Sequence, residues 1–193
     1  MVCGKTISYL RLRLITGKAV KIIQIIETER LYLRQYEDDD FTSLYAIFSD
    51  PETMSYYPAP FSIQKTRDWI KRNQERYESD GFGLWAICLK GTNEVIGDCG
   101  LVKQIIDNCV EVEIGYHIHK RLWGKGFASE AAIACKTYGF HQLGLKKMVS
   151  IIDPDNLASI RVAEKIGFTK ESEVFIFNKT HLIYSSVDSK SNN

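Results

Sequence analysis

The chain has 193 residues, of which 45% are hydrophobic and 25% are charged, which is enough for one well-buried domain. Its 25 basic and 24 acidic residues nearly cancel. Beyond residue 26 the 24 acidic residues outnumber 20 basic ones, and this mildly acidic body argues against a nucleic-acid-binding surface. No apolar run approaches the ~20 residues that a membrane-spanning helix needs. We therefore expect neither nucleic acid nor a membrane as a partner, and a cytoplasmic location.

The N-terminal segment differs in charge from the rest of the chain. Residues 1–26 carry five basic side chains and no acidic one. We interpret residues 1–21 as a disordered basic extension, residues 22–187 as one domain, and residues 188–193 as a polar tail. The five cysteines form neither a C-x-x-C pair nor a zinc spacing with histidine, so we expect buried thiols in a reducing compartment.

Hydrophobic periodicity and capping residues predict the elements of the domain. A strand within 25–36 is followed by a helix from about Asp38 to Phe48, and Ser62 then caps a second helix that ends near Ser79. The later elements are strands over 83–89, 95–103 and 110–119, a helix after Gly126 to about His141, a strand over 147–152, a helix over 156–166, and a hairpin of 168–177 with 182–187. This order predicts a mixed α+β domain with helices on both faces of one sheet.

The segment Arg121–Ala128, RLWGKGFA, predicts an anion site. Glycines at alternate positions let neighbouring amide N–H groups converge, and the helix that follows points its N-terminus at the same anion. The segment is neither a P-loop nor a dinucleotide-binding fingerprint, because it has no Gly-Lys-Ser/Thr ending and no acidic residue about 20 positions later. A purely structural glycine turn is the alternative.

A second motif, NLASIRVAEKIGF over 156–168, follows about thirty residues later. Together the two motifs resemble the signature segments of the GNAT N-acetyltransferase superfamily. The segments ETERLYLR over 27–34 and VEIGY over 112–116 further resemble the branch of ribosomal-protein alanine and serine N-terminal acetyltransferases. The resemblance implies a single domain whose mostly antiparallel sheet splays between two central parallel strands, here 110–119 and 147–152.

The resemblance also implies that acetyl-CoA, the acetyl donor, binds in the gap between those strands without a metal. The pantetheine arm would pair with the backbone, and the loop amides would bind the pyrophosphate. The residues implied for donor binding are Tyr116, His117, Ile118, Arg121, Gly124, Lys125, Gly126, Phe127, Ala128, Asn156 and Ser159. For Arg121 the alternative is a solvated residue flanking the loop.

The acid and base are less plainly marked. We interpret Glu113 as the general base, with Glu111 as its substitute and a paired surface carboxylate as the alternative. The tyrosine that many family members place seven residues after the asparagine is Ala163 here, which leaves the Ser159 hydroxyl to hydrogen-bond the departing sulfur. His117 and His119 alternate on the strand of Glu113, but no further ligand completes a metal site.

The acceptor side is implied to lie between the first two strands, where Tyr56, Tyr57 and Phe61 are our candidates for substrate binding. The expected function is acetyl transfer to a primary amine by direct attack in a ternary complex, in a monomer or homodimer. A protein N-terminus, a polyamine, an amino sugar and a drug-like amine all fit. The rival interpretation is a catalytically weak CoA-binding sensor, which Ala163 favours and Glu113 opposes.

Overall fold

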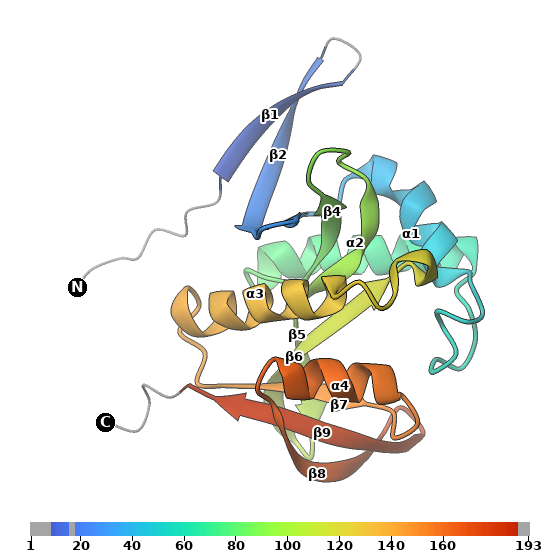
Figure 1. Ribbon diagram of the computed structural model, residues 1–193, viewed down its shortest axis with the longest axis vertical. Coiled ribbons are helices and arrows are strands. Elements are labelled where there is room, and N and C mark those ends of the chain that lie inside the picture. Colours follow the sequence, from blue (N-terminus) through green and yellow to red (C-terminus); the bar gives the residue numbers. More distant parts are fainter. Residues whose placement is uncertain (1–8, 16–17, 189–193) are drawn as a thin grey trace.

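The computed structural model describes residues 9–15 and 18–188, with side chains from residue 23 onward. Its elements form one sheet with helices on either side (Figure 1). In chain order they are β1 (Tyr9–Ile15), β2 (Lys18–Glu27), β3 (Leu31–Arg34), the 3-10 helix η1 (Asp38–Asp40), α1 (Phe41–Phe48), α2 (Ile63–Ser79), β4 (Leu84–Leu89), β5 (Val95–Ile106), β6 (Cys109–Ile118), the 3-10 helix η2 (Lys120–Leu122), α3 (Phe127–His141), β7 (Lys147–Ile152), α4 (Leu157–Lys165), β8 (Thr169–Ile176) and β9 (Lys179–Val187).

The strand order in the sheet is β1-β2-β3-β4-β5-β6-β7-β9-β8. Neighbouring strands are antiparallel except β6 and β7, which are parallel and pair at Glu113 opposite Val149. Helix α3 connects these two strands, as a crossover between parallel strands requires. The predicted fold, a mostly antiparallel sheet with two central parallel strands, is confirmed.

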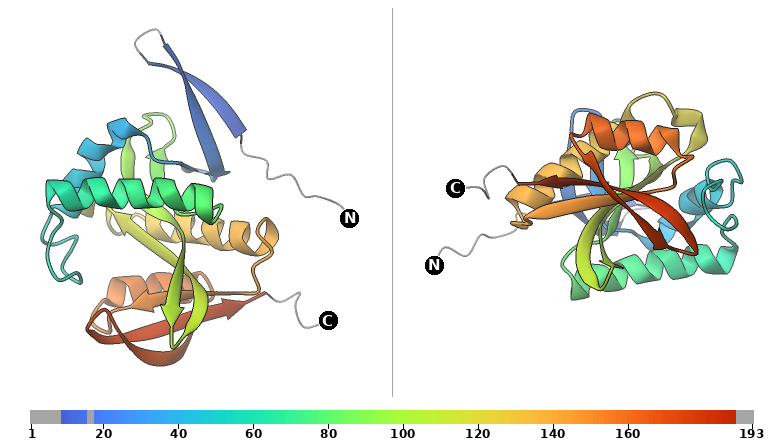
Figure 2. Two further views of the ribbon diagram at one scale, coloured as in Figure 1. Left: turned by 180° about the vertical axis from the view of Figure 1, so that it is seen from behind. Right: turned by 90° about the horizontal axis from the view of Figure 1, so that it is seen from below.

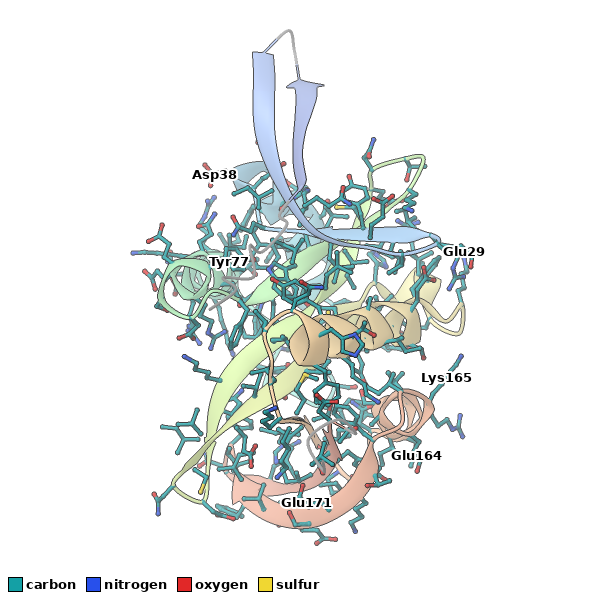
Figure 3. All side chains as sticks on the ribbon, turned by 90° about the vertical axis from the view of Figure 1, so that its left-hand side faces the viewer. Glu29, Asp38, Tyr77, Glu164, Lys165 and Glu171 are labelled. Atoms are coloured by element: carbon teal, nitrogen blue, oxygen red, sulfur yellow. The ribbon has the colours of Figure 1, made fainter. Side chains whose placement is uncertain are left out.

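Helices cover both faces of the sheet (Figure 2). Figure 3 shows the labelled Tyr77 of α2 on one side of the sheet and Glu164 and Lys165 of α4 on the other. Because both faces are covered, the central strand β4 reads LWAICL without alternation. Trp85 and Ile87 join the core under α3, whereas neighbouring β4 side chains join the core under α1 and α2. The predicted layers are therefore present.

The N-terminal extension differs from the disordered segment that we predicted. Within its described part, β1 and β2 form an antiparallel hairpin that joins the sheet beside β3 and projects from the body of the molecule (Figure 1). The missed signal is the sequence of β1, YLRLRLI, in which leucine alternates with arginine at the period of a strand. Residues 1–8 and 16–17 of this extension, and 189–193 of the predicted tail, lie outside the described residues.

No helix within residues 9–15 and 18–188 combines the length and the apolar character that crossing a membrane requires. This finding concerns helices alone.

Candidate active site

The gap between β6 and β7 begins just beyond the point where the strands pair. The Ser150 hydroxyl donates to the Ile114 carbonyl at 3.1 Å, and β6 then runs on to Ile118 along the antiparallel partner β5. The backbone N–H of His119 donates to the carbonyl of Ile96, in β5, at 2.9 Å. Since the backbone polar groups of a strand alternate between its two neighbours, Tyr116 faces the gap.

This alternation changes the predicted backbone contacts of β6. Three residues were expected to pair with a ligand in the gap. His117 is one of them, but its backbone groups point toward β5, because it lies two residues before His119 along the chain. The Ile118 carbonyl accepts a hydrogen bond from the Trp123 indole at 2.7 Å. Three consecutive residues of a strand cannot all present backbone groups to one side, and the sequence prediction overlooked this.

The predicted anion loop has the expected backbone shape. Gly124 and Gly126 have φ of +74° and +81°, a left-handed conformation that favours glycine. Apart from Gly124 and its two chain neighbours, no atom of the described residues lies within 4 Å of the position that a Cβ at Gly124 would take. Gly126 is the N-cap of the 15-residue helix α3, so the free N–H groups of its first turn lie beside the loop.

Arg121 does not turn toward this loop. Its guanidinium forms an ion pair with Glu94, in the turn before β5. Of the two interpretations of Arg121, this contact fits the flanking residue.

Arg30, which the sequence analysis did not single out, contacts the glycine loop and the first turn of α3. Its Nη1 donates to the Lys125 carbonyl at 3.0 Å, and its Nε donates to Glu130 of α3 at 2.6 Å. The guanidinium also lies 4.4 Å from the centre of the Phe127 ring. Burial would raise the pKa of Glu130, but hydrogen bonds from Thr28 and Arg30 hold it below its usual range. Arg30 thus ties the loop to the start of β3.

On the far side of the gap, α4 begins with a capped turn. The Asn156 side-chain oxygen accepts the backbone N–H of Ser159 at 3.0 Å, as an N-cap does. The Tyr116 hydroxyl reaches across the gap and donates to the Ser159 carbonyl at 3.2 Å. Ala163, in the place of the tyrosine of many relatives, is fully buried. These contacts bring the first turn of α4, with Asn156 and Ser159, next to Tyr116.

Glu113 and His117 share one face of β6, because they are four residues apart on a strand. Glu113 accepts a hydrogen bond from Gln104 of β5 at 2.7 Å. Burial raises the pKa of Glu113 above its usual range, against a smaller lowering by this hydrogen bond. Glu111, the substitute base, forms an ion pair with Lys147 at 3.0 Å instead.

Of the three aromatic candidates, Tyr57 contacts His117 and Phe61 packs behind Tyr57. The Tyr57 ring lies 5.4 Å from the imidazole, and Phe61 packs edge-on against Tyr57 at 5.8 Å. Phe48 of α1 and Trp69 of α2 complete the cluster on the imidazole. Tyr56 points elsewhere: its hydroxyl donates to the Asp155 carbonyl, in the turn before α4, at 3.2 Å.

Asp98 is the buried charge of this cluster, and the sequence analysis missed it. Its carboxylate has no exposed surface and accepts hydrogen bonds from Tyr36 at 2.6 Å and Trp69 at 3.2 Å, while His117 Nδ1 lies 2.7 Å away. An aspartate in the apolar stretch IGDCGL of β5 was the available signal, because a buried carboxylate needs several partners.

The described residues contain no group of three potential metal ligands. His117 binds Asp98 and Tyr57, and His119 Nδ1 instead accepts the backbone N–H of Arg121 at 3.3 Å.

The chain matches the profile of the acetyltransferase (GNAT) domain over residues 30–169. It is 43% identical to the uncharacterized protein YkkB of Bacillus subtilis over 81% of this chain and 92% of YkkB. It is 36% identical to the uncharacterized N-acetyltransferase p20 of Bacillus licheniformis, over 77% and 84% of the two chains.

Solved structures share the fold. An acetyltransferase from Agrobacterium tumefaciens superposes with a TM-score of 0.75 at 28% identity, covering 84% of this chain and 94% of that one. The ribosomal L7/L12 acetyltransferase RimL in complex with coenzyme A superposes with a TM-score of 0.69 at 19% identity, over 85% and 97% of the chains; this likeness concerns the fold alone. The chain belongs to the GNAT family of acetyltransferases and is an N-acetyltransferase.

Proposed function

We propose that the protein transfers an acetyl group from acetyl-CoA to a primary amine by direct attack while both substrates are bound. The observation that carries this proposal is the parallel pair β6 and β7, which separates after Glu113 and is followed by the left-handed glycine loop. When bound, acetyl-CoA supplies an activated acetyl thioester. Everything else that the reaction needs comes from the position and protonation of the chain's own side chains.

The residues of the gap fit a CoA molecule. The open space beside Gly124 and the free amides at the start of α3 suit a pyrophosphate. The backbone of Tyr116 suits the amides of the pantetheine arm. The residues that we assign to donor binding are Tyr116, Gly124, Lys125, Gly126, Phe127, Ala128, Asn156 and Ser159.

Two side chains are proposed to handle protons at the reacting centre. Glu113 lies where the gap begins, and its raised pKa suits a base that works near neutral pH. Ser159 lies across the gap on α4, where its hydroxyl can donate to the departing sulfur. We expect Ser159→Ala to reduce turnover less than Glu113→Gln does, because a hydrogen bond to sulfur is a weaker contribution than proton removal.

The acceptor is proposed to be a cationic amine with an apolar body. The cluster of Tyr57, Phe61 and Trp69 offers aromatic faces beside the carboxylates of Asp98 and Glu113. Aromatic faces and carboxylates both favour an ammonium group over a neutral one. Tyr57→Ala should therefore raise the KM for the amine and leave the affinity for acetyl-CoA unchanged.

The proposed function is tested by measuring free thiol released from acetyl-CoA. The amines to be tested are a polyamine, an amino sugar and a peptide with a free N-terminus. The product of each reaction is then analysed by mass spectrometry. We expect at least one amine to give thiol and N-acetylated product in equal amounts. Binding of acetyl-CoA by calorimetry without transfer to any amine would instead favour the CoA-binding sensor.

A further inference from the structure

A continuous line of hydrogen bonds runs from the loop before α2 to a buried carboxylate. The Tyr57 hydroxyl lies 2.7 Å from His117 Nε2, and His117 Nδ1 lies 2.7 Å from an oxygen of Asp98. The three residues come from the loop before α2, from β6 and from β5. Asp98 and His117 are direct neighbours across the two strands.

The chemistry of the partners sets the direction of these hydrogen bonds. A carboxylate only accepts, so His117 Nδ1 carries the proton that it donates to Asp98. In a neutral imidazole Nε2 is then an acceptor, and the Tyr57 hydroxyl donates to it. The oxygen of Tyr57 keeps lone pairs for a further donor. Tyr57 is partly exposed, and we assign the acceptor amine as that donor.

Aromatic rings and two carboxylates surround His117. Phe48 from α1 and Trp69 from α2 pack their uncharged rings against the imidazole. The charged and titratable groups that face it are Asp98 from β5, Glu113 from its own strand, and Tyr57 from the loop. Asp98 also accepts a hydrogen bond from Tyr36, which holds the carboxylate in place beside the imidazole.

We propose that the line Tyr57, His117 and Asp98 removes the first proton of the acceptor ammonium, and so delivers the neutral amine that attacks. This inference rests on the proposed function. The ammonium N–H passes its proton to the Tyr57 oxygen while the phenolic proton of Tyr57 moves to His117 Nε2. An imidazolium remains, paired with Asp98, which positions it.

The proton balance of the reaction requires two acceptors. An ammonium that becomes an amide loses two N–H protons, and the departing thiolate takes up one. Glu113, at the start of the gap, is assigned the second N–H proton, and the first leaves through His117 to solvent after the product departs. Desolvation of the Tyr57 hydroxyl, with the charges of Glu113 and Asp98, raises the pKa of Tyr57. The two transfers at Tyr57 therefore occur together, without a free tyrosinate.

The test compares His117→Gln and Tyr57→Phe with the wild type, using an amine that the wild type acetylates and a fluorinated analogue of it whose ammonium is more acidic. Near pH 7 we expect kcat/KM of His117→Gln to fall by roughly 10²-fold for the basic amine. The loss for the basic amine should shrink as pH rises, because that amine is neutral at high pH. The loss for the fluorinated amine should be small already near pH 7, because this less basic amine is neutral there. Tyr57→Phe should show the same pattern with a smaller loss.

Tyr45→Phe is the matched control, since it removes a phenol hydroxyl from a ring that stacks on Phe41, outside the cluster. A loss in His117→Gln that is independent of both pH and amine basicity would mean a merely structural role, and unchanged kinetics would equally overturn the proposal. If His117→Gln fails to fold by thermal melting, Tyr57→Phe decides by the same criteria.

A readout without turnover separates this proposal from the proposed function. Nitrogen NMR of the wild type should show the neutral His117 protonated at Nδ1 and free at Nε2. The opposite tautomer overturns the relay even if the enzyme is active. Absence of transfer to every amine, with the expected tautomer present, overturns the proposed function, and with it the role of the relay, while the hydrogen-bonded line itself stands.

Discussion

At the scale of single residues, the loop glycines connect sequence most directly to binding. Gly126 combines a φ of +81° with the N-cap position of α3. We expect Gly126→Val to weaken acetyl-CoA binding at least tenfold, about 1.4 kcal/mol, because a branched side chain strains this backbone and occupies the proposed phosphate site. Calorimetry with CoA measures the effect.

Gly144→Val is the matched control for this prediction. Gly144 also has a positive φ, of +66°, but it lies in the turn between α3 and β7. Both variants should lose stability through backbone strain, whereas only Gly126→Val should lose affinity for CoA. Equal affinity in the two folded variants would remove the loop from the binding site.

Glu113 gives a second prediction at this scale, which concerns catalysis. Glu113→Gln keeps the shape and can still accept from Gln104, but it cannot take a proton. Turnover should fall by roughly 10²-fold, with acetyl-CoA affinity little changed. In a profile of kcat against pH, the wild-type kcat should rise with pH through the raised pKa of Glu113. The variant should not show this rise.

The same substitution, which lowers turnover, should raise the stability of the folded protein at neutral pH. Because burial raises the pKa of Glu113, this group favours the folded state below the ordinary carboxyl pKa and loses that contribution as pH rises through the raised value. Glu113→Gln should therefore melt at a higher temperature than the wild type at neutral pH, with little difference at acid pH. An equal difference at both pH values would contradict this account.

At the scale of elements, a buried ion pair joins the end of β3 to the helix that follows. Arg34 donates through both terminal nitrogens to Asp40, at 2.7 Å each, and both side chains are almost fully buried. Burial would lower the pKa of Arg34, but the hydrogen bonds and charge of Asp40 raise it overall. The pair fixes where η1 leaves the sheet and so supports α1, which carries Phe48.

Removing one partner of this ion pair should destabilise the protein far more than replacing both partners with apolar residues. Arg34→Met leaves Asp40 charged and buried, and should lower the free energy of unfolding by about 3–5 kcal/mol. Arg34→Met combined with Asp40→Leu should recover part of that loss, because no unpaired charge remains. Urea denaturation of the single and double variants checks this, and a double variant less stable than the single one would refute the explanation.

At the scale of the whole molecule, the N-terminal hairpin extends the sheet away from the site (Figure 1). Among the described strands, β1 pairs with β2 alone, whereas β2 also pairs with β3. A chain that starts at residue 22 keeps the part of β2 that contributes the buried Ile26. We expect it to fold, to bind CoA with unchanged affinity in calorimetry, and to melt only slightly lower than the full chain.

This truncation also tests the predicted domain boundary. Loss of CoA binding, or a melting point lowered as much as by a core substitution, would place the first 21 residues inside the domain. Retention of both properties would support a domain over residues 22–187.

The elements and the backbone shape of the glycine loop could be predicted from sequence because their causes are local. Ser62 caps α2 within three residues, the two loop glycines set their own φ, and Asn156 caps α4. The GNAT motifs placed these pieces in order and implied the parallel pair. The leucine and arginine alternation of β1 was equally local, and was overlooked.

Only the tertiary structure brought together groups that are distant in the chain. Tyr57 meets His117 from 60 residues away, and Arg30 meets Glu130 from 100 residues away. Periodicity tells which side of a strand a residue occupies, but not which loop covers that side or which strand lies next to it. Those choices follow from the strand order and from packing of the helices on each face, and they decided that Asp98, His117 and Tyr57 form one hydrogen-bonded line.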